Sequence, residues 1–125
     1  MSTARRVGTR SADMNIEFKK EWSMANVPMV MQVGPLHYSV MRCAESDEVL
    51  ARAARMGESD HYECIVRIYS RLPKQQLNET FWHELCHCID YVMLNGKLEE
   101  DEIACFARGL YQVVKQLGVE FCDES

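Results

Sequence analysis

The strongest constraint on the fold is a pair of long helical segments separated by Asn95-Gly96. The first segment is predicted to begin near Pro73, because proline suits a first helical turn, where its missing N–H costs nothing. Asn-Gly pairs end helices because both residues readily adopt left-handed backbone angles. The second segment is predicted to run from about residue 98 to residue 118. Since the link is so short, the two segments are expected to form an antiparallel helical hairpin.

The second segment is amphipathic. Its apolar residues recur at intervals of three and four, which is typical of a helix with one buried side. Four consecutive acidic residues at positions 99–102 suit the positive end of the helix dipole. The apolar stripe predicted to face the first helix consists of Ile103, Phe106, Ala107, Leu110, Val113, Val114 and Leu117.

Strand-forming sequence precedes the hairpin. Residues 36–43 and 62–69 are rich in β-branched and aromatic residues and are predicted to be strands. Residues 44–56 are predicted to form a helix that ends at Gly57. The expected fold is therefore α+β, a short sheet packed on the helical hairpin. The 125 residues suffice for one domain, expected over residues 14–125 after a disordered tail at 1–13.

Charge and cysteine content narrow the function classes. A net charge of −5 gives no electrostatic reason to expect nucleic acid or an anionic membrane as partner. Residues 1–13 lack the apolar stretch of a signal peptide, and nothing approaches the ~20 apolar residues of a membrane span. The expected location is the cytoplasm, with the six cysteines reduced. Four of them are predicted to be small core residues: Cys43, Cys64, Cys88 and Cys105.

The first helical segment carries a His-Glu-x-x-His motif at His83, Glu84 and His87. Residues four apart share one face of a helix, so both imidazoles can converge on one zinc ion. Glu84 can then reach a water bound to the metal. Zinc lowers the pKa of that water to about 7, so a carboxylate can take its proton and later pass it to a leaving amine. The motif predicts a zinc hydrolase in which Glu84 is the general base.

A catalytic zinc usually has three protein ligands, so a third is expected on the returning helix. At about 1.5 Å per residue, Glu102 lies closest to the level of His87 and beside the apolar stripe. Glu99 and Glu100 are alternatives, in that order. Asp90 shares the histidine face and stays open as a ligand, but one straight helix seldom supplies three ligands, so a role in orienting His87 is preferred. Cys105 also stays open as a ligand, whereas His61 is expected to be an exposed loop residue.

From Ile65 to Leu117 the chain resembles small zincin-like metallopeptidases of phages and prophages, and more distantly the ImmA/IrrE-like metallopeptidases. The similar stretches are the 65–68 strand, Leu72-Pro73, the His-Glu-x-x-His motif and Ala107–Val113; Val33–Val40 is similar to the family's N-terminal strand pair. The resemblance implies a minimal zincin core whose edge strand pairs with an extended substrate. It also implies Glu102 as the third ligand, since a Phe-Ala pair follows it, although Ile103 replaces the usual small residue.

The expected function is hydrolysis of a peptide bond, with narrow specificity, in a peptide or protein substrate. If the chain is phage-encoded, the host cytoplasm is the expected location. The alternative is a non-catalytic protein of the same fold that binds a partner and holds a structural zinc. Such a site would be closed by a cysteine, Cys105 or Cys64. The acidic balance and the lack of a basic helix speak against a DNA-binding regulator.

Overall fold

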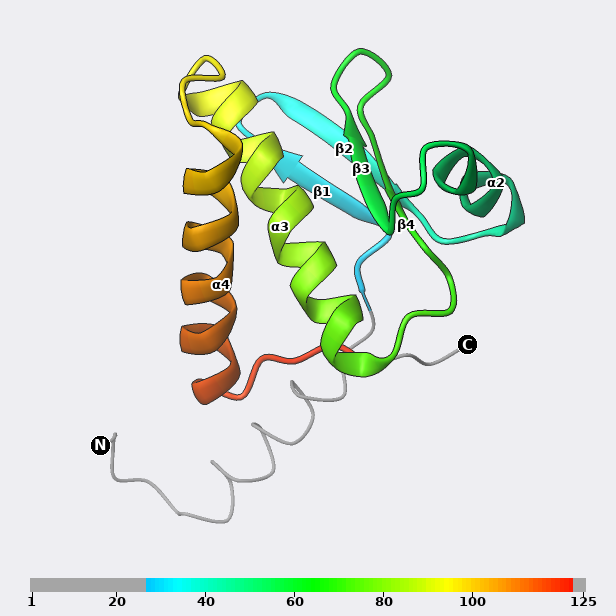
Figure 1. Ribbon diagram of the computed structural model, residues 1–125. Coiled ribbons are helices and arrows are strands. Elements are labelled where there is room, and N and C mark those ends of the chain that lie inside the picture. Colours follow the sequence, from blue (N-terminus) through cyan, green and yellow to red (C-terminus); the bar gives the residue numbers. More distant parts are fainter. Residues whose placement is uncertain (1–26, 123–125) are drawn as a thin grey trace.

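The computed structural model describes residues 27–122 and has an α+β fold (Figure 1). It contains a four-stranded mixed sheet and three helices. The predicted tail at residues 1–13 and the first part of the predicted domain, residues 14–26, lie outside the described residues.

The sheet has the strand order β1-β2-β4-β3. β2 (Leu36–Met41) and β4 (Ile65–Ile68) are parallel neighbours at its centre, and β1 (Val30–Val33) and β3 (Gly57–Asp60) are antiparallel edge strands. The connection from β2 to β4 runs through α2 (Ala44–Arg52) and β3. Among residues 27–122, β3 pairs on one side only, with β4.

The two central strands fall within the strands predicted from the residue pattern, which missed both edge strands; the resemblance implied a strand pair over Val33–Val40, and β1 ends at Val33. The sequence of β3, Gly-Glu-Ser-Asp, has no apolar residue, so it carries no strand signal. The helix predicted over residues 44–56 ends early, at Arg52. The chain leaves it through Ala54, whose left-handed φ is 55°, and Gly57 begins β3 instead of ending the helix.

The helical hairpin lies along the sheet (Figure 1). It consists of α3 (Lys74–Met93) and α4 (Glu100–Gln116), and Asn95 and Gly96 take the expected left-handed angles between them. The main core lies between the sheet and α3 and includes the fully buried Tyr38, Ile68, Leu77 and Phe81.

α4 packs on α3 through a smaller cluster of Cys86, Ile103 and Ala107. The apolar stripe predicted on α4 is wider than this contact. Phe106, Val113 and Leu117 are 62%, 54% and 64% exposed. The buried residues of α4 recur every four positions along a single line: Ile103, Ala107 and Tyr111.

Two buried side chains of α3 fix the ends of α4 by hydrogen bonds to backbone. Near the hairpin turn, the Asp90 carboxylate accepts a hydrogen bond from Leu98 N–H at 3.1 Å. Beyond the other end of α4, the Asn78 amide donates to the Phe121 carbonyl at 3.0 Å and accepts from Phe121 N–H at 2.8 Å. Asp90 thus bonds the connection between the helices, and its predicted role in orienting His87 stays a prediction.

All six cysteines lie in the described residues, and five of them are free thiols: Cys43, Cys64, Cys86, Cys88 and Cys105. Cys86 and Cys88 are buried, but Cys105, predicted to be a core residue, is exposed because it lies on the outer side of α4. Between residues 27 and 122, the helices are too short or too polar to cross a membrane.

Candidate metal centre

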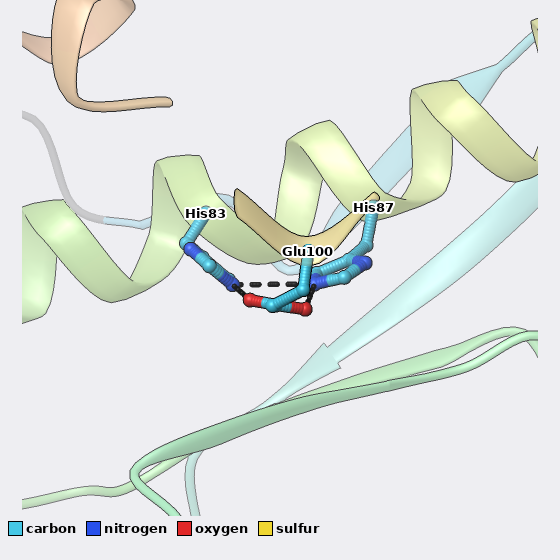
Figure 2. A group of neighbouring side chains, drawn as sticks. All are labelled: His83, His87 and Glu100. Carbon is cyan, nitrogen blue, oxygen red and sulfur yellow. Dashed lines mark hydrogen bonds and ion pairs between the residues drawn. The ribbon is translucent and has the colours of Figure 1, made fainter. Parts of the chain in front are cut away.

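α3 presents its two histidines side by side, one helical turn apart (Figure 2). The Nε2 atoms of His83 and His87 are 3.2 Å apart. Their side chains are 27% and 26% exposed, so both rings are largely covered while their tips remain accessible. The helical spacing predicted this pair, and the structure confirms that the two side chains converge.

Glu100, the first residue of α4, completes the group. Its carboxylate oxygens lie 2.9 Å from His83 Nε2 and 3.1 Å from His87 Nε2 (Figure 2). In the described part of the chain, these three residues could together bind a metal ion. Each has one ligand atom, and the three atoms all lie within 4.8 Å of one another.

Glu102 is not part of this group, contrary to the order expected from sequence. Its carboxylate accepts a hydrogen bond from Glu99 N–H at 2.8 Å and so caps the start of α4. Glu99 itself is the N-cap residue, with extended backbone angles. Extended residues advance about twice as far as helical ones. Because the link after α3 includes extended backbone, the chain reaches the level of the histidines at Glu100. A count that assumes helical rise throughout reaches that level two residues later, at Glu102.

The three side chains fit a zinc ion. Zinc binds imidazole nitrogen and carboxylate oxygen at ~2.0–2.1 Å, so two ligands of a tetrahedral ion are roughly 3.3 Å apart. The observed separations of 2.9–3.2 Å are slightly shorter than that. Two histidines and one glutamate are also a common donor set of catalytic zinc. The group thus has the composition and spacing of a three-ligand site.

Glu84 lies directly beside this group and is only 7% exposed. Ser59 of β3 donates a hydrogen bond to its Oε1 atom at 2.7 Å. Burial raises the pKa of Glu84, while the Ser59 hydroxyl and the two histidines oppose that rise. The carboxylate is therefore held in one orientation, and its proton affinity is higher than that of an exposed glutamate.

β3 supplies the wall opposite α3. Alternation along the strand turns Gly57 and Ser59 toward α3 and turns Glu58 and Asp60 toward Arg67 on the other face. A Cβ atom on Gly57 would lie 2.5 Å from Thr80 Cγ2 and 3.2 Å from Glu84 Cγ, so only glycine allows this approach. Sequence reasoning missed Ser59, because the strand that positions it has no apolar pattern.

A cavity of about 370 Å³ opens over the group. Polar residues of β3 and α3 line it, and no cysteine is among them. Cys105 instead accepts a hydrogen bond from Arg108 at 3.5 Å, and Cys64 packs against the main core. The fourth side of the group thus faces open space. The lining residues are Arg55, Gly57, Glu58, Ser59, His61, His83, Glu84, His87 and Glu100.

His61 also lines this cavity, although it was expected to be an exposed loop residue. Its Nδ1 atom is 2.9 Å from the hydroxyl of the fully buried Tyr38. Its ring stacks on Tyr91, with 4.3 Å between centroids and 2° between planes. The side-chain alternation that turns Ser59 toward α3 turns residue 61 the same way. Because β3 was not predicted from the sequence, the direction of His61 could not be predicted either.

No family model, curated protein or solved structure matches the chain.

Proposed function

We propose that this chain is a metal-dependent hydrolase and, more particularly, a zinc metallopeptidase. The observation that carries the proposal is the buried carboxylate of Glu84 beside the His83, His87 and Glu100 group, at the floor of an open cavity. A site with only a structural role has no use for a second, oriented carboxylate beside its ligands. It also has no use for an open fourth side.

Each residue has a defined task in this proposal. His83, His87 and Glu100 would hold a zinc ion, which would supply Lewis acidity and lower the pKa of a bound water. Glu84 accepts a proton from the water that attacks the carbonyl carbon and, as the C–N bond breaks, passes that proton to the leaving nitrogen. The hydrogen bond from Ser59 fixes the direction in which that carboxylate faces.

The edge strand β3 favours a peptide as substrate. Its outer side has no strand partner among the described residues, and it runs along the cavity. An extended peptide can therefore add to the sheet beside β3, with main-chain hydrogen bonds that hold its carbonyl groups in register. We also propose that the protein belongs to the small zincin-like class that the sequence resembles. In this proposal it acts in a cytoplasm and cleaves a narrow range of sequences.

The experiment is cleavage of a proteome-derived peptide library by the zinc-loaded protein, read by mass spectrometry of new termini. We expect cleavage at a restricted set of sequences, its loss on treatment with 1,10-phenanthroline, and its return on adding zinc. The absence of cleavage by protein that retains one zinc per chain would overturn the proposal. It would favour the non-catalytic, partner-binding alternative.

Replacing Ser59 by alanine should weaken the reaction without removing it. The Ser59 hydroxyl stabilises the ionised form of Glu84, so its loss raises the pKa of that carboxylate. The acid limb of the pH–rate profile is therefore expected to move to higher pH, with roughly a tenfold lower rate at the acidic end. The measurement is kcat/KM against pH for the best library peptide. An unmoved acid limb would contradict the role given to Ser59.

A further inference from the structure

The imidazole of His61 is a polar group of the cavity to which the proposed mechanism assigns no task. It follows β3 directly and is half-buried. The Asp60 carboxylate accepts hydrogen bonds from the backbone N–H groups of Tyr62 and Glu63, at 3.1 Å and 3.0 Å, and so shapes the turn that carries it. Together with the Tyr91 stack and the Tyr38 hydroxyl, these contacts fix the ring in position and rotation.

The contact with Tyr38 indicates which ring nitrogen carries the proton. Burial keeps the Tyr38 hydroxyl protonated, since it raises the pKa of that phenol. The neighbouring Cys88 also stays protonated, because burial raises the pKa of its thiol to about 11. A thiol sulfur is a weak acceptor and an imidazole nitrogen is a strong one. The Tyr38 hydroxyl therefore donates to Nδ1 of His61, which leaves the proton of the neutral ring on Nε2.

The neutral ring is also the form that this position favours. Burial is the main cause that lowers the pKa of His61, and it outweighs the carboxylates of Asp60 and Asp90, which raise it. With Nδ1 engaged by Tyr38, the Nε2–H group is the free polar end of a ring that lines the cavity. It is a hydrogen-bond donor on a fixed ring that lines the same cavity as Glu84.

We propose that His61 is the electrophilic residue of this site, donating its Nε2–H to the carbonyl oxygen of the scissile peptide as negative charge develops there. This inference rests on the proposed peptidase function. A preorganised donor of this kind acts mainly in the transition state, so its loss lowers kcat and changes KM little. Tyr38 and Tyr91 are positioning residues for it.

The test compares His61→Phe and His61→Gln with wild type on a peptide found in the library screen. Phenylalanine keeps an aromatic ring to stack on Tyr91 but has no donor, whereas glutamine restores an N–H group. We expect kcat to fall about 100-fold in His61→Phe, with partial recovery in His61→Gln. KM and zinc content should stay unchanged. The matched control is His37→Phe, since His37 is exposed on β2 and lies outside the cavity lining.

A second readout is independent of activity. Long-range proton–nitrogen NMR of the imidazoles should find the His61 proton on Nε2 in wild type and a shift toward Nδ1 in Tyr38→Phe. A wild-type proton on Nδ1, or His61→Phe with undiminished kcat, would overturn this inference while leaving the peptidase intact. A zinc-loaded wild type that cleaves nothing would instead remove the peptidase function, and the role of His61 with it.

Discussion

Replacing Glu100 by alanine is expected to reduce zinc affinity by well over 100-fold, beyond the 10–100-fold typical of losing an outer hydrogen-bond partner of a ligand. Glu100 supplies both carboxylate oxygens found within 3.1 Å of the histidine Nε2 atoms. Two imidazoles on one helix would remain, and such a pair alone is a weak site. The measurement is competition with a chelating dye on protein purified without a metal-affinity tag, together with elemental analysis.

Glu102→Ala is the matched comparison, because both residues are exposed acids in the first turn of α4. Its carboxylate bonds the Glu99 backbone, so its loss should cost about 1 kcal/mol of stability, as for other helix caps. Zinc affinity should change less than threefold. The opposite pattern, zinc lost in Glu102→Ala and kept in Glu100→Ala, would restore the ligand expected from sequence and contradict the site described above.

Glu84→Gln is expected to retain one zinc per chain and to lose cleavage by about 10³-fold or more. A positioned general base contributes 10²–10⁴-fold, and a glutamine amide cannot accept the proton. The change conserves volume at a buried site, and the amide oxygen can still accept the hydrogen bond from Ser59. A loss of rate can therefore be separated from a loss of fold by recording zinc content and thermal stability on the same samples.

The control for Glu84→Gln is Glu102→Gln, which removes one negative charge elsewhere and keeps an acceptor for the cap of α4. We expect it to cleave at the wild-type rate. If Glu84→Gln cleaved the library peptide at more than a tenth of the wild-type rate, Glu84 would not be the base. The hydrolytic role would then need another group in the cavity.

Short-range periodicity predicted the part of the site that lies on one helix. The four-residue spacing of His83 and His87 fixes their common face, whatever the rest of the chain does. Glu100 could not be separated from Glu99 and Glu102 in this way. Its position depends on how far the link between α3 and α4 advances per residue, which is a property of backbone angles and not of residue type.

The side of the cavity formed by β3 could not be predicted from the sequence, for a different reason. β3 is a strand because it pairs with β4, not because of its own sequence, which is entirely polar apart from Gly57. Pairing of this kind is non-local, so a window of sequence does not contain it. Ser59 and His61 take their directions from this strand, and both were therefore missed.

The hydrogen bonds between Asn78 and Phe121 and between Asp90 and Leu98 determine how precisely Glu100 is placed beside the two histidines. Both come from α3, and they hold the chain just outside the two ends of α4. Sliding α4 along α3 by a single residue would move Glu100 about 1.5 Å, whereas metal–ligand distances tolerate only about 0.2 Å. The position of Glu100 along α3 is thus fixed from both ends of α4, by a hydrogen bond two residues before Glu100 and by a pair of hydrogen bonds beyond the far end of the helix.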